Sequence, residues 1–72
     1  MTPNQCKMAR AGLNWRAADL AERCGISRVT IARFEGGNPV DGDSIDKMQK
    51  ALTDAGADFT RRAGRVGVTV PE

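Results

Sequence analysis

Apolar residues recur at helical spacing in four short stretches of the first 56 positions. Apolar side chains three or four residues apart are typical of a helix that buries one face. The pattern predicts helices over residues 3–11 and 17–23, a third between Ser27 and Gly36, and a fourth between Asp43 and Gly56. The expected inward-facing residues are Gln5, Met8, Ala9 and Gly12; Ala17, Leu20, Ala21 and Cys24; Ile31 and Phe34; and Ile45, Met48, Ala51, Leu52 and Ala55.

Capping residues bound these stretches. Thr2 followed three residues later by Gln5 predicts a capping box at the first helix. Gly12 is expected to end that helix as a left-handed cap. Ser27 is expected to cap the third helix and Asp43 the fourth. Residues 1–56 are therefore expected to form one helical unit.

The period of the pattern changes after Gly56. Residues 57–60 and 66–70 are extended in character, and the second segment has an apolar residue at every other position. Residues 61–65 would form the turn between them. The sequence thus predicts a mainly α chain with four helices, or five, followed by a C-terminal strand or hairpin within residues 57–72.

Composition narrows the chemistry that the chain supports. The sequence has no histidine and only two cysteines, Cys6 and Cys24, without a CxxC pair. His-based acid–base catalysis and a one-chain zinc site are therefore not expected. Both cysteines are predicted to be small buried hydrophobes. Neither an enzyme, a cofactor, a metal nor a small-molecule ligand is expected in 72 residues of this composition.

Charge is unevenly distributed along the chain. Residues 1–33 carry six Lys or Arg and two acids, whereas residues 34–60 carry two Lys and six acids. A basic first half suits a polyanion such as nucleic acid, although a solvated mixed surface has the same composition. The chain shows no signal-peptide pattern and no apolar run of membrane-spanning length, so a cytoplasmic location without a membrane partner is expected.

The most informative stretch is residues 17–36, AADLAERCGISRVTIARFEG. Ala21 is small where two helices would cross closely, and Gly25 suits the tight turn between them. Ile26 and Ile31 would fill the angle between the helices. With Leu20, Ser27 and Phe34-Glu35, these residues have the spacing of a DNA-binding helix-turn-helix.

Residues Met8 to Ala55 resemble the phage-repressor-like helix-turn-helix proteins of the Cro/repressor or XRE type. DLAERCGISRVTIARFEGG is similar to the central signature of that family. The resemblance implies a lambda-repressor-like fold and a bacterial or phage-encoded protein. It also implies a homodimer that binds double-stranded operator DNA and regulates transcription, often as a repressor.

The resemblance further implies which residues face the DNA. Arg28 and Arg33 would donate to guanine, and Val29 and Ala32 would touch thymine methyl groups. The implied base-reading residues are Ser27, Arg28, Val29, Thr30, Ala32 and Arg33, and the implied phosphate-contacting residues are Arg16, Ala17, Arg23 and Asn38.

Three further positions bear on the resemblance. Arg10 and Glu35 match a structural pair between the first and third helices of the family. Where the family places Ser or Thr followed by Gln, this chain has Arg16 and Ala17, so the side-chain cap of the second helix is lost. Trp15 is expected to cover the corner between the first two helices.

The C-terminal segment admits more than one role. The apolar alternation predicts dimerisation through Phe59, Val66, Val68 and Val70, whereas a second arrangement keeps the valines inside one chain. An antitoxin-like module whose C-terminal strand binds another protein remains an alternative. A single-stranded RNA binder fits less well because stacking aromatic residues are nearly absent. Arg61, Arg62 and Arg65 belong either to a solvated turn or to a DNA-contacting segment.

Overall fold

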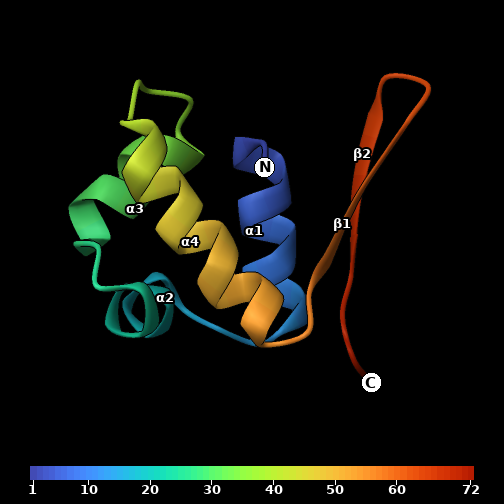
Figure 1. Ribbon diagram of the computed structural model, residues 1–72, viewed down its shortest axis with the longest axis horizontal. Coiled ribbons are helices and arrows are strands. Elements are labelled where there is room, and N and C mark those ends of the chain that lie inside the picture. Colours follow the sequence, from blue (N-terminus) through green and yellow to red (C-terminus); the bar gives the residue numbers. More distant parts are fainter.

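The computed structural model describes residues 1–72 as four helices followed by a two-stranded antiparallel sheet (Figure 1). The prediction of a mainly helical chain ending in a hairpin is confirmed, with four helices rather than five. No helix is both long enough and apolar enough to cross a membrane. The elements are α1 (Pro3–Gly12), α2 (Ala17–Cys24), α3 (Arg28–Glu35), α4 (Gly42–Asp54), β1 (Asp58–Arg62) and β2 (Arg65–Thr69).

Most of the predicted helix boundaries are confirmed. Thr2 and Gln5 form the capping box of α1. Gly25 ends α2 in the left-handed conformation (φ 72°), and Ser27 Oγ accepts a hydrogen bond from the Thr30 N–H at the start of α3.

Two boundary predictions were wrong. The cap of α4 is Asp41, whose Oδ2 accepts from the Ser44 N–H at 3.0 Å, so the helix starts earlier than a cap at Asp43 would allow. Gly12 lies within α1, and the left-handed residue after that helix is Asn14 (φ 60°).

The reason for a glycine at position 12 is space. A Cβ atom there would lie 2.8 Å from a methyl group of Val70, so the missing side chain makes room for the C-terminal segment. Gly56 lies under the same segment, because a Cβ atom on it would lie 2.5 Å from Pro71. Both glycines thus allow the end of the chain to pack against the helices.

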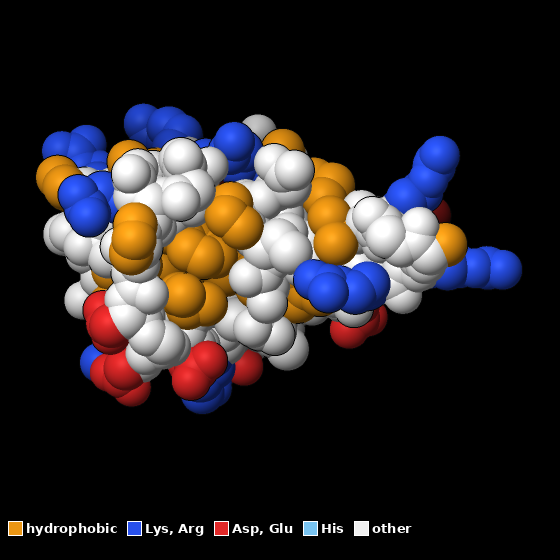
Figure 2. All heavy atoms as spheres, turned by 90° about the horizontal axis from the view of Figure 1, so that it is seen from above, with side chains coloured by type: hydrophobic (Ala, Val, Ile, Leu, Met, Phe, Trp, Pro, Cys, Tyr) orange, Lys and Arg blue, Asp and Glu red, His pale blue; other side chains and the backbone are white.

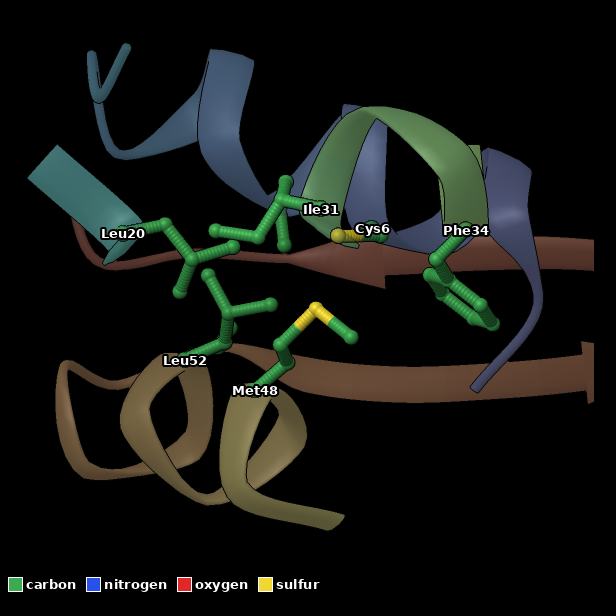
Figure 3. Packing of buried hydrophobic residues seen from close by; sticks show 8 residues of the cluster. Cys6, Leu20, Ile31, Phe34, Met48 and Leu52 are labelled. Atoms are coloured by element: carbon green, nitrogen blue, oxygen red, sulfur yellow. The ribbon is translucent and has the colours of Figure 1, made fainter. Parts of the chain in front are cut away.

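The core lies between the four helices and the start of the hairpin (Figure 3). Met48 is fully buried as predicted, but Met8 is 38% exposed. The buried stripe of α1 runs through Cys6 and Ala9, one residue around the helix from the predicted stripe, and this rotation turns Met8 outward. The buried hydrophobic residues are Cys6, Ala9, Leu20, Ile31, Phe34, Met48, Leu52 and Ala57.

The hairpin turns more tightly than the sequence suggested. Arg62 pairs with Arg65, so the turn is only Ala63-Gly64 and the predicted five-residue turn was wrong. Both turn residues have positive φ, 51° and 75°, which is the type I′ conformation that matches the twist of paired strands.

One face of the hairpin packs on the helices of its own chain. Phe59 pairs with Val68, and cross-strand partners share a face of the sheet. Phe59, Val68 and Val70 all pack against the core, and β2 lies against α1. The arrangement therefore resembles the second one considered above, in which the valines stay inside one chain. Dimerisation through this segment stays a prediction.

A buried amide holds the hairpin to α1. Gln5 is 4% exposed, and its Nε2 donates to the carbonyl oxygens of Thr60 (2.9 Å) and Gly67 (3.2 Å). Its Oε1 accepts from the Thr2 N–H at 2.9 Å. Thr60 and Gly67 are cross-strand partners, so one side chain joins the start of α1 to both strands.

Replacing Gln5 with leucine is expected to lower the free energy of unfolding by about 2 kcal/mol, since a helix cap and two links to the hairpin are lost together. Urea denaturation followed by circular dichroism measures this change. Asn4→Leu is the matched control, because Asn4 is exposed on the same turn of α1. Equal unfolding midpoints for the two variants would contradict the anchoring role.

Candidate nucleic-acid interface

Helix α3 presents one face to the core and the other to solvent. Ile31 and Phe34 point inward, toward Leu52 and Met48 of the other side of the core (Figure 3). This inner pair fixes the rotation of the helix. The outward-facing residues of α3 are Arg28, Val29, Ala32 and Arg33, all of them exposed.

The position of α3 relative to α2 follows from the short turn between them. Gly25 adopts the left-handed conformation that a residue with a side chain rarely takes. Ala21, Cys24 and Ile26 are half-buried and pack against the core at this corner. The turn is therefore held in place by its own side chains, and it sets the angle at which α3 projects.

Two of the six predicted base-reading residues have their hydroxyl groups engaged within the protein. Ser27 Oγ lies 3.0 Å from Thr30 Oγ1, in addition to its capping bond. Val29 is 70% exposed and lies on the outward face of α3. An exposed valine between charged residues suits contact with an apolar group such as a thymine methyl.

Arg28 and Arg33 are free of acidic partners. The four ion pairs of the molecule are Arg10–Glu35, Arg16–Asp19, Lys47–Asp43 and Lys50–Asp54. Figure 2 shows Lys and Arg side chains along one edge of the helical body, while most of the visible Asp and Glu lie along the opposite edge. The two signs of charge are thus separated across the molecule.

The predicted phosphate-contacting residues lie at three separate places in the structure. Arg16 and Ala17 lie at the start of α2, and the exposed Asn38 follows α3. Arg23 lies at the other end of α2, where its guanidinium carbon is 4.4 Å from the centre of the Trp15 ring. The half-buried Trp15 packs against the core as expected, but Arg23 covers its ring.

The start of α2 uses a cap that the sequence reading missed. Asp19 Oδ2 accepts from the Arg16 N–H at 2.8 Å. This backbone hydrogen bond, aided by the Arg16 side chain, lowers the pKa of Asp19. An acid three residues after the first capping position is a known signal for such a cap. The carboxylate also places a negative charge beside two of the predicted phosphate contacts.

Arg10 and Glu35 form a two-pronged ion pair between α1 and the end of α3. Arg10 Nε and Nη2 donate to the two carboxylate oxygens of Glu35, both at 2.7 Å. The exposed fractions of the two side chains are 20% and 10%. Arg10 Nη1 also donates to the Trp15 carbonyl oxygen at 3.2 Å, so this arginine ties α3 to the connector before α2.

The environment of this pair shifts three pKa values. Burial alone would raise the pKa of Glu35, but hydrogen bonds from Arg10 and Cys6 and the charge of Arg10 hold it below its ordinary value. The hydrogen bond to Glu35 raises the pKa of Arg10. Burial, together with the nearby Glu35 carboxylate, raises the pKa of the Cys6 thiol to about 12. Cys6 is therefore a neutral core residue.

Comparison with known proteins agrees with this geometry. A helix-turn-helix family model of the XRE, Cro/repressor-like type matches residues 7–53, which is well over half of the chain and ends within α4. The hairpin lies outside the matched range. No curated protein matches the chain significantly. With α2 and α3 joined at Gly25 and the outer face of α3 exposed, the chain belongs to the XRE-type helix-turn-helix family of DNA-binding domains found in transcription regulators.

Proposed function

We propose that the chain is a sequence-specific regulator of transcription, a repressor that reads an inverted-repeat operator with α3 in the major groove. The observation that carries this proposal is the outer face of α3. Arg28 and Arg33 are exposed there without acidic partners, on either side of the exposed Val29. Arginine donating to guanine O6 and N7 is the commonest specific contact in the major groove.

Dimer formation is part of the same proposal. Two copies related by a two-fold axis would present two α3 helices about one DNA turn apart, roughly 34 Å, which matches an inverted repeat. The outer edge of β2 supports this arrangement, because Arg65 beside the turn is the one charged residue of that strand, whereas β1 carries Asp58, Arg61 and Arg62. Charged residues on a strand edge discourage pairing with another strand.

The first test is DNA selection followed by substitution. The protein is used to enrich duplexes from a random pool, and binding to the enriched sequence is measured by fluorescence anisotropy. Arg28→Ala and Arg33→Ala are each expected to weaken specific binding by about 1–3 kcal/mol and to relax the preference at one base pair. Folding should be unchanged, since both side chains point outward.

Lys50→Ala is the matched control for the loss of one positive charge, because Lys50 lies on α4 and pairs with Asp54 at 2.8 Å. It should retain wild-type binding and sequence preference. If both arginine variants bound the enriched duplex as tightly as this control, α3 would not be the reading helix. Failure of the wild-type protein to enrich any sequence would contradict the proposed function itself.

A further inference from the structure

The tip of the hairpin carries an isolated group of three arginines. Arg61, Arg62 and Arg65 flank the Ala63-Gly64 turn, and every residue from 60 to 65 is exposed. The remainder of the hairpin is different, since residues 66–68 are half-buried and both Phe59 and Val68 pack against the core. Figure 1 shows the turn projecting beyond the helical body. We call these three arginines the basic tip.

The three arginines of the basic tip do not stabilise the fold. Arg62 lies directly opposite Arg65 in the strand register, and like charges in that position destabilise a hairpin. Arg61 follows at the next pair, opposite Val66. None of the four ion pairs of the molecule includes any of the three arginines. Three uncompensated positive charges at one point suit an external polyanion.

The basic tip is also held in a defined position. The type I′ turn matches the twist of the two strands, and Gln5 bonds both strands at the Thr60–Gly67 pair, two residues before the turn pair. A charged group held in place before binding loses less conformational entropy when it binds. Successive residues of a strand point to opposite faces, so Arg61 projects from one face and Arg62 from the other.

The size of the molecule relates the basic tip to α3. The longest extent is 29 Å, which is shorter than one turn of B-DNA, about 34 Å. In Figure 1, α3 and the basic tip lie at opposite ends of this extent, so a duplex that contacts both must run along the length of the molecule. Figure 2 shows Lys and Arg at this end of the molecule as well as along the edge of the helical body.

We propose that the basic tip binds the phosphate backbone of double-stranded DNA, outside the base pairs that α3 reads. This inference rests on the proposed function. The tip offers guanidinium groups and a small Ala63-Gly64 turn, without an apolar wedge or an aromatic side chain for stacking on bases. The contact therefore adds affinity that does not depend on sequence, and it lengthens the stretch of DNA that one subunit covers.

Salt dependence of binding tests this assignment, because each neutralised phosphate contributes about 0.9 to the slope of log K against log salt concentration. The variants are Arg61→Gln, Arg62→Gln and Arg65→Gln, singly and together, with Lys50→Gln as the control for one lost charge. The triple variant is expected to reduce the slope by about 1.8, since Arg62 and Arg65 share one face of the hairpin and Arg61 projects from the other. Its affinity for the enriched duplex and for a scrambled duplex should fall by the same factor.

Two further measurements sharpen the result. Neutral methylphosphonate linkages outside the base pairs that α3 reads should weaken binding by the wild type but not by the triple variant. Thermal unfolding should show the triple variant to be at least as stable as the wild type, since the repulsion between Arg62 and Arg65 is relieved.

The outcomes separate the two proposals. If the wild type binds the enriched duplex and the triple variant has the slope and affinity of the Lys50→Gln control, the basic tip does not contact DNA and only this inference fails. If the wild type binds no duplex, the proposed function fails with it. If the triple variant keeps duplex binding but no longer retains an RNA or an acidic protein that the wild type retains, the partner is that molecule and the DNA assignment is overturned.

Discussion

Replacing Arg10 with leucine is expected to leave a large fraction of the molecules unfolded at neutral pH. Glu35 would keep its charge in a site where only 10% of its side chain is exposed, and its two 2.7 Å hydrogen bonds from Arg10 would be gone. Removing one partner of a buried ion pair costs about 3–5 kcal/mol, and the residual exposure of this pair favours the lower value. A domain of this size has only about 3–5 kcal/mol in total.

Urea denaturation of the wild type, Arg10→Leu and the double variant Arg10→Leu, Glu35→Leu measures the effect. The double variant should be more stable than the single variant, because no charge is left unpaired. Lys50→Ala is again the control, and it should lose about 0.5 kcal/mol or less, since its pair is exposed on one face of α4. A single variant as stable as Lys50→Ala would show that the pair does not hold α1 to α3.

The same experiment has a pH dependence with a defined sign. Arg10 holds the pKa of Glu35 below its ordinary value, so the pair stabilises the fold above the unfolded pKa, about 4.3, and this stability is lost as pH falls through the folded pKa. In Arg10→Leu, the burial that raises the pKa of Glu35 is no longer offset by an arginine, so the folded variant is destabilised wherever Glu35 must be ionised. The gap in stability between wild type and variant should therefore narrow below about pH 4.

Replacing Val66 with proline is expected to convert a dimer into a folded monomer. The residues beside a type I′ turn exchange hydrogen bonds with each other, and the pairs alternate from there. Arg61 and Val66, the next pair, therefore point their N–H groups away from the hairpin. Proline at position 66 removes a donor from the outer edge of β2 while the bonds between β1 and β2 remain.

Sedimentation should give twice the chain mass for the wild type and one chain mass for Val66→Pro. Arg61→Pro is the matched control, because it removes the corresponding donor from the outer edge of β1, and it should stay dimeric. Binding to an operator with two half-sites should weaken about 10²–10⁴-fold in Val66→Pro, with no change on a single half-site. A Val66→Pro protein that remained dimeric would place the interface elsewhere.

The helical part of the fold could be predicted from sequence because its signals are local. Ser27, Gly25 and the spacing of Leu20, Ile31 and Phe34 each act within one or two helical turns, and the structure places them as expected. The pairing of Arg10 with Glu35 was expected only through the family resemblance, since the two residues are 25 positions apart.

The features that the sequence did not predict depend on contacts between distant segments. Gln5 has a polar side chain on a helix start, and nothing near it in the sequence indicates that its amide meets Thr60 and Gly67. The spacing of apolar residues in a short helix leaves the position of the buried stripe uncertain by one residue. Met8 was expected in the core for this reason, but Cys6 is buried in the structure and Met8 faces outward. The hairpin register likewise depends on which two residues of the turn have positive φ. Alanine rarely has positive φ, so the sequence does not point to Ala63 as one of them.

The space left by Gly12 and Gly56 has a consequence for how sequences of this family change over time. Each glycine lies where a Cβ atom would collide with the C-terminal segment, Gly12 with Val70 and Gly56 with Pro71. A mutation at Gly12 can be accepted only together with a smaller or displaced residue at position 70. In homologues that keep this hairpin, side-chain volume at positions 12 and 70 should therefore covary, whereas homologues that lack it are free to carry larger residues at position 12. Position 56 should stay glycine in both groups, because its φ of 102° disfavours any side chain.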